Sequence, residues 1–250
     1  MVALGSDVFL DCAQEQLLEH AQTQLKDLAR THRCSAHPLF DYLRTETLTR
    51  PQIAAVLRNY DAHASVLRRL LLKAATIMPE AAVGYILENV RNEYGNGDYS
   101  RNHQAQLQDV AWSSGVSRET YFRVSIRSEI KRFITEAVRF YDPAGDVSAK
   151  GHYKPAVAAG AITATELLAI EEFKALQCAF AKLDLQHHIW FHHVTIEEQH
   201  SDDSVALALH FMTNPEWHRS VLFGLNGILD ANVYLYDGLF SALLNPHPDL

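Results

Sequence analysis

The sequence predicts an all-α protein that folds as a single domain over residues 1–250. Three observations favour this fold class. Glycine and proline, which weaken helices, are few, with 11 Gly and 8 Pro in 250 residues. Apolar residues recur at spacings of three and four over most of the chain, as in amphipathic helices. No segment shows sustained alternation of apolar and polar residues bounded by turns, so no sheet is expected.

The first half of the chain divides into helices at clear start and stop signals. Thr49, followed by Arg50 and Pro51, is typical of an N-cap and a first helical turn. The glycines of the segment 95–97 are typical of a helix stop. The expected helices here span residues 6–31, 39–44, 50–78, 79–94 and 103–115.

The second half is also helical and has one long connection. Ser117 is expected to open an amphipathic helix that runs to Tyr141. Residues 142–154 hold two glycines and a proline and are expected to form a loop over the bundle. Asn214 and Pro215 are typical of the cap of a last helix. The expected helices here span residues 117–141, 156–183, 185–212 and 215–240, which together predict a helical bundle.

Composition excludes several classes of partner and location. The net charge is −8 with a pI near 5.9, which argues against a nucleic-acid-binding protein. No run of 18 apolar residues occurs, so no membrane span is expected. The N-terminus lacks the basic and apolar regions of a signal peptide. The three cysteines are scattered without a CxxC pair, which favours reduced thiols and a cytoplasmic protein.

His193, Glu197 and His200 form the most informative motif in the chain. Spacings of four and three place the three side chains on one face of a helix. Two imidazoles and a carboxylate make half of a divalent metal site, and the absence of thiolates favours iron or manganese. The chain carries 14 His, however, so a solvated polar helix face is an equally good interpretation of this segment alone.

Glu93 and His103 are candidates for the other half of such a site. Glu93 ends one expected helix, and His103 lies just inside the next helix. The glycines between them allow a tight reversal of the chain, which can bring the two side chains together. The alternative is a helical hairpin with an exposed glutamate and an exposed histidine.

Glu166 is the remaining candidate. It lies in a helical stretch of small and apolar residues, 158–169, with no other charge. A buried carboxylate without a partner is costly, whereas a metal-bridging carboxylate is stable there. Glu171 and Glu172 follow on a more polar part of the same helix, beside Lys174, and we interpret them as solvated.

These residues resemble the haem-oxygenase-like diiron oxidases and oxygenases, which share the all-helical architecture of haem oxygenase and the thiaminase-type proteins. In that family a Glu and a His flank a turn, a Glu lies on a middle helix, and a His-x3-Asp/Glu-x2-His motif comes late. The resemblance therefore implies a haem-oxygenase-like bundle. Some members add a carboxylate from an earlier helix, for which Asp61 is the counterpart. The metal ligands that the resemblance implies are Glu93, His103, Glu166, His193, Glu197 and His200.

A ferritin-like carboxylate protein is the nearest structural alternative. Such a protein needs two Glu-x-x-His motifs on separate helices. Only the pair Glu197 and His200 has this spacing in the chain, which argues against a ferritin-like fold.

The resemblance also implies a reaction. It implies two iron ions that cycle between Fe(II) and Fe(III), O2 as co-substrate, and a small amino-acid or amino-acid-derived substrate. C–H abstraction would lead to desaturation, C–C cleavage or ring formation in specialised-metabolite biosynthesis. A homodimer and an electron donor are the further partners it implies. The alternatives are a diiron N-oxygenase of an amine and a non-redox metal- or ligand-binding helical protein.

The substrate lining can also be predicted. Aliphatic and aromatic walls suit a mid-sized molecule, and a cation near the motifs would bind a carboxylate. The candidate wall residues are Tyr85, Phe133, Tyr153, Phe173 and Trp190, and the candidate cations are Arg91, Arg101 and Lys154. The alternative, which is the commoner case for such residues, is that the aromatic residues belong to the ordinary core and the cations to the ordinary surface.

Overall fold

The computed structural model describes residues 6–246, with the side chains of residues 15–192 and 201–246. In that part of the chain every regular element is an α-helix or a short 3-10 turn, which confirms the all-α prediction. None of these helices combines the length and the apolar character needed to cross a bilayer. The helices are α1 (Ser6–Thr31), α2 (Pro38–Thr45), α3 (Arg50–Ile77), α4 (Glu80–Glu93), α5 (His103–Ser113), α6 (Arg118–Arg123), α7 (Ser128–Tyr141), α8 (Lys154–Ala181), α9 (His193–Met212) and α10 (Pro215–Leu244).

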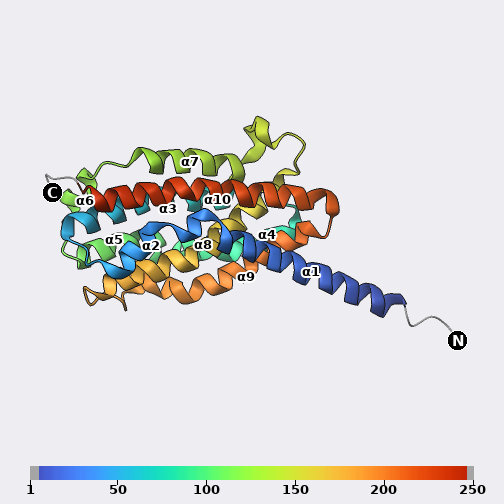
Figure 1. The fold of residues 1–250 in the computed structure, drawn as a ribbon, viewed down its shortest axis with the longest axis horizontal. Helices are drawn as coiled ribbons and strands as arrows, with labels where there is room; N and C mark the ends of the chain where they lie inside the picture. Colours follow the sequence, from blue (N-terminus) through green and yellow to red (C-terminus); the bar gives the residue numbers. More distant parts are fainter. Residues whose placement is uncertain (1–5, 247–250) are drawn as a thin grey trace.

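The long helices lie along one axis and bury a common core. In Figure 1, α10 spans the length of the bundle, and the first half of α1 extends beyond it. The contacts of α10 are most extensive with α8, followed by those with α7 and α3. That residues 1–250 form a single domain stays a prediction.

Two glycines allow α8 and α10 to approach each other closely. A Cβ atom added at Gly160 would overlap the backbone carbonyl of Val221, and one added at Gly224 would overlap that of Val157. The two helix backbones are therefore in direct contact at this crossing. Since α8 carries Glu166, this crossing fixes the position of that carboxylate relative to α10.

Several predicted helix ends are confirmed. The first helix has the expected bounds. Thr49 caps α3 through a capping box with Gln52, whose Oε1 accepts from the Thr49 backbone N–H at 2.9 Å. Asn214 caps α10, with its Oδ1 accepting from the backbone N–H of Glu216 at 2.9 Å.

Two predicted helices are wrong in extent. The helix expected over 117–141 is interrupted between α6 and α7, where Asn59 of α3 bonds the backbone. The Asn59 Oδ1 accepts from the N–H of Arg127 at 2.8 Å, and its amide donates to the carbonyl of Ser125 at 3.5 Å. The helix expected over 185–212 begins only at residue 193, because residues 189–192 form a 3-10 turn.

Candidate metal centre and the adjoining cavity

Glu93 and His103 meet across the turn between α4 and α5, as the sequence predicted. The Oε1 of Glu93 lies 2.8 Å from the Nδ1 of His103. Gly95 permits this turn, since its φ is +73° and an added Cβ would lie 2.7 Å from the backbone nitrogen of Asn102. Asn102 in turn caps α5, with its Oδ1 accepting from the N–H of Ala105 at 2.8 Å. The first residue of α5 is therefore held against the last residue of α4.

Glu166 is buried, as expected, with 6% of its surface exposed. The side-chain amide of Asn89 donates a hydrogen bond of 2.6 Å to its Oε1. Asn89 lies one turn before Glu93 on α4, so this bond orients Glu166 toward the helix that ends in Glu93. Asn89 was not among the predicted site residues.

Tyr141 connects the two carboxylates electrostatically. Its hydroxyl donates to Thr165 Oγ1 at 2.8 Å. Burial raises the pKa of Tyr141 well above its usual range, and the negative charges of Glu166 and Glu93 raise it further, although the bond to Thr165 lowers it. Both carboxylates therefore lie close enough to this buried hydroxyl to affect its pKa.

A cavity of about 90 Å³ adjoins these groups. Glu93, His103 and Glu166 all line it, together with apolar residues from several helices. Three of the five predicted wall residues are among them, and their contact with a substrate stays a prediction. The main apolar wall residues are Leu67, Leu71, Leu107, Phe133, Phe173 and Trp190.

The other predicted lining residues lie elsewhere. Tyr85 is 38% exposed, and Tyr153 stacks on Trp217. The cations Arg91, Arg101 and Lys154 are exposed, and within the described part of the chain the cavity wall includes none of them. Arg68 of α3 is the cation that lines the cavity.

The prediction that Glu172 is solvated is wrong. Only 8% of this residue is exposed, and it lines the cavity. Its Oε1 accepts from the hydroxyl of Tyr236 at 2.6 Å, and its Oε2 from that of Tyr60 at 3.2 Å. Glu171 is solvated as predicted and pairs with Arg44 at 2.8 Å. Adjacent helical residues point about 100° apart, so one faces the core and the other faces water.

His63 is a second polar residue that the sequence analysis did not identify. It is 3% exposed and lines the cavity, and neither ring nitrogen has a hydrogen-bond partner in the part of the chain whose side chains are described. Burial lowers its pKa to about 3, so the imidazole is neutral at pH 7. The signal was present, because Tyr60 and Leu67, three and four residues away, are apolar and share one helix face with His63.

Comparison with known proteins identifies the family. Residues 54–233 match the family of iron-containing redox enzymes, and this span holds all six predicted metal ligands. The chain belongs to this family.

Several solved structures share the fold of this chain. A CADD-like protein of unknown function from Nostoc punctiforme is 17% identical with a TM-score of 0.68, covering 90% of this chain and 98% of its own. A domain of unknown function with a heme oxygenase-like fold from Shewanella denitrificans is 11% identical with a TM-score of 0.66, covering 99% and 97%. A TenA family transcription regulator from Silicibacter is 13% identical with a TM-score of 0.61, covering 89% and 96%. The fold is therefore haem-oxygenase-like, as predicted. A search of curated proteins gave no match.

The predicted late motif of metal ligands lies at the start of α9. The side chains of His193, Glu197 and His200 are outside the described residues. The backbone of α9 packs against α8 and α4, the helices that carry Glu166 and Glu93. Trp190, just before α9, lines the cavity. Among the side chains that are described, no three His, Cys, Asp or Glu residues are grouped closely enough to hold a metal ion, so the six-ligand set stays a prediction.

The described donors fit the iron that the family implies. Glu93 and Glu166 supply carboxylate oxygens and His103 supplies an imidazole nitrogen, which are ligands that suit iron. The pair of Glu93 and His103 already brings an oxygen and a nitrogen to 2.8 Å from each other.

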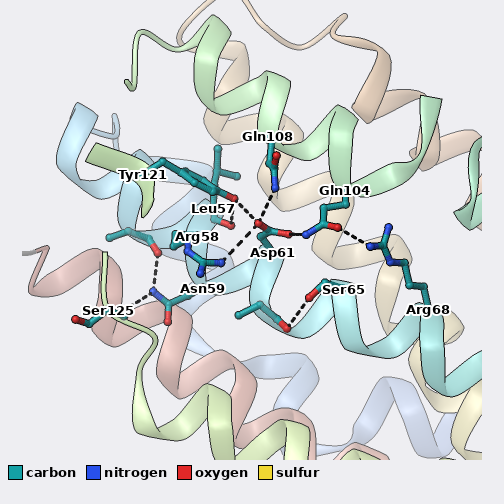
Figure 2. Close-up of polar contacts among 12 residues, drawn as sticks. Leu57, Arg58, Asn59, Asp61, Ser65, Arg68, Gln104, Gln108, Tyr121 and Ser125 are labelled. Carbon is teal, nitrogen blue, oxygen red and sulfur yellow. Dashed lines mark hydrogen bonds and ion pairs between the residues drawn. The ribbon is translucent and has the colours of Figure 1, made fainter. Parts of the chain in front are cut away.

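Asp61, the counterpart of an additional family carboxylate, is bound on both oxygens by side chains of the fold. Figure 2 shows both of its oxygens engaged by side chains of α3, α5 and α6. The Oδ1 accepts from Gln104 at 2.7 Å, and the Oδ2 accepts from Gln108 and Tyr121, each at 3.1 Å. Arg58 lies 3.7 Å from the same Oδ2. Since these contacts use both oxygens, they favour a structural role over metal ligation.

Asp61→Ala is expected to destabilise the fold without removing iron. Two amides and a tyrosine hydroxyl would lose a buried acceptor, which costs about 1–3 kcal/mol in the free energy of unfolding. Urea unfolding of the variant measures this loss, with Asp41→Ala, at an exposed carboxylate of α2, as the control. A folded Asp61→Ala protein that retains clearly less iron per chain than the wild type would contradict the structural role.

Proposed function

We propose that this protein is a non-haem diiron oxidase that uses O2 to oxidise a small amino-acid or amino-acid-derived molecule. The observation that carries the proposal is the convergence of Glu93, His103 and Glu166 on one largely apolar cavity, in a member of an iron-containing redox family. The residues that would hold the metal are Glu93, His103, Glu166, His193, Glu197 and His200.

The chemistry of the metal and the role of the protein can be separated. When bound, the two irons would supply the redox chemistry by which O2 oxidises a C–H bond. The chain holds the substrate: Phe133, Phe173 and Trp190 offer apolar contact and keep water from the reacting carbon. Asn89 orients the Glu166 carboxylate through its 2.6 Å hydrogen bond.

The reaction class we favour is C–H abstraction leading to desaturation, C–C cleavage or ring formation, in the biosynthesis of a specialised metabolite. A largely apolar cavity beside the predicted metal ligands favours attack on carbon, because the reacting C–H bond could be held there against apolar side chains. N-oxygenation of an amine is the second reaction that the same donor set could support.

Anaerobic loading with Fe(II) tests the proposal. We expect about two irons per chain after removal of unbound metal, followed by O2 consumption when selected amino acids are added. The same protein loaded with Zn(II), which has no redox chemistry, should consume no O2. A chain that retains no iron, or an iron-loaded chain that leaves O2 untouched with every amino acid tried, would contradict the diiron oxidase.

A further inference from the structure

The cavity contains a second group of polar side chains besides the predicted metal ligands. Glu172 of α8, together with Tyr60 and His63 of α3, lines the same space. Glu172 and His63 are buried, at 8% and 3% exposure. Neither residue belongs to the ligand set, and both face the volume where a substrate would lie.

Glu172 is a buried carboxyl group that has no cationic partner among the described side chains. Its partners are the hydroxyls of Tyr60 and Tyr236, and no ion pair among the described side chains includes it. Burial raises the pKa of Glu172, and these two hydrogen bonds lower it in part. A positive charge entering the cavity would supply the missing countercharge, since an opposite charge at close range stabilises the carboxylate.

His63 offers a second, independent contact. Both of its ring nitrogens are buried and have no hydrogen-bond partner among the described residues, which is costly unless a ligand supplies one. The neutral ring has one acceptor nitrogen and one N–H donor.

Tyr60 contacts both Glu172 and His63, so these two residues lie close together in the cavity wall. Its ring centroid lies 4.4 Å from that of His63, and its hydroxyl donates to Glu172 at 3.2 Å. Tyr60 and His63 are three residues apart on α3 and so share one helix face. A single small cation could therefore meet both residues.

We propose that Glu172 and His63 recognise a protonated amine of the substrate, with Glu172 as the countercharge and His63 as a hydrogen-bond acceptor. A primary ammonium group carries three N–H donors, enough for one carboxylate oxygen and one imidazole nitrogen. This inference rests on the proposed function, because the amine belongs to the substrate that the cavity holds. It assigns the recognition of an amine to Glu172 and His63, and not to the whole cavity wall, since Arg68 of α3 also lines the cavity.

Binding of matched amines and alcohols tests this assignment. The probes are benzylamine against benzyl alcohol and n-butylamine against n-butanol, titrated into the full chain at pH 7 under nitrogen, with and without Fe(II). We expect each amine to bind about tenfold or more tightly than its alcohol, the effect of one charge-assisted hydrogen bond. Calorimetry measures both dissociation constants.

Two variants separate the two residues. Glu172→Gln keeps an acceptor for the tyrosine hydroxyls but removes the charge, so it should equalise amine and alcohol binding. His63→Leu should weaken both, because either probe can donate to the imidazole. Glu171→Gln, at the exposed neighbour of Glu172, is the matched control and should keep the wild-type preference.

The outcomes are distinct. Equal binding of amine and alcohol by the wild type, or a preference that survives in Glu172→Gln, would overturn the inference. The wild-type comparison decides the question even if Glu172→Gln does not fold. The titrations without Fe(II) test amine binding independently of the metal. Failure of iron loading would therefore contradict the diiron oxidase and leave the amine site standing. An absent amine preference in a chain that binds iron would contradict only the amine site.

Discussion

Glu166→Ala is expected to reduce bound iron from about two per chain to fewer than one and to lower O2 consumption by more than about 100-fold. Glu166 is the predicted ligand on the middle helix, and it is buried at 6% exposure. Without its carboxylate, Glu93 and His103 remain as the described donors, too few to complete the coordination of two ions. Iron analysis after anaerobic loading, together with an oxygen electrode, measures both effects.

The control for this prediction lies on the same helix. Glu171→Ala removes an exposed carboxylate five residues later and should leave both readings at the wild-type level. Loss of Glu166 also leaves the amide of Asn89 without its acceptor, which costs about 1–3 kcal/mol. Helix content by circular dichroism therefore has to be compared as well. A folded Glu166→Ala protein with wild-type iron content would show that this carboxylate is not a ligand.

Gly160→Ala is expected to destabilise the protein by about 2–3 kcal/mol even though alanine favours helices. The helix-propensity gain is about 1 kcal/mol, but the new methyl group would overlap the backbone carbonyl of Val221 on α10. Because a backbone atom cannot move aside as a side chain can, α8 and α10 must separate and lose packing along the crossing. For a chain of this length we expect Tm to fall by about 4–12 °C, which calorimetry measures.

Gly84 provides the matched control. It lies inside α4, where an added Cβ would have nothing within 4 Å. Gly84→Ala should therefore raise stability by about 0.5–1 kcal/mol, through helix propensity alone. If Gly160→Ala stabilised the fold as Gly84→Ala does, the close contact of α8 with α10 would be wrong.

Most helices could be predicted from local sequence patterns. The prediction failed where a residue far away in the sequence bonds to the backbone and ends a helix. Caps such as Thr49 and Asn214 are local signals, and the structure confirms both. The break between α6 and α7 depends on Asn59, whose bond to Arg127 joins residues 68 positions apart. The pattern of residues 117–141 was amphipathic throughout, so nothing in its own sequence indicated this interruption.

Some features of the candidate site could likewise be predicted from nearby residues, and others could not. The pairing of Glu93 with His103 was predictable because ten residues and a glycine turn connect them. The burial of Glu172 was not, since its tyrosine partners lie 112 and 64 positions away on α3 and α10. A pair of adjacent glutamates near a lysine has the same local pattern whether one of them faces the core or both face water.

Glu166 and Glu172 both belong to α8, and this has a consequence for regioselectivity. Six residues of an α-helix rise about 9 Å along its axis, a length that a rigid helix keeps constant. If Glu166 holds iron and Glu172 holds the amine, as proposed above, the oxidised carbon would lie at a fixed distance from the nitrogen. In a homologous series of amines, lengthening the far end of the molecule would then leave the oxidised carbon unchanged.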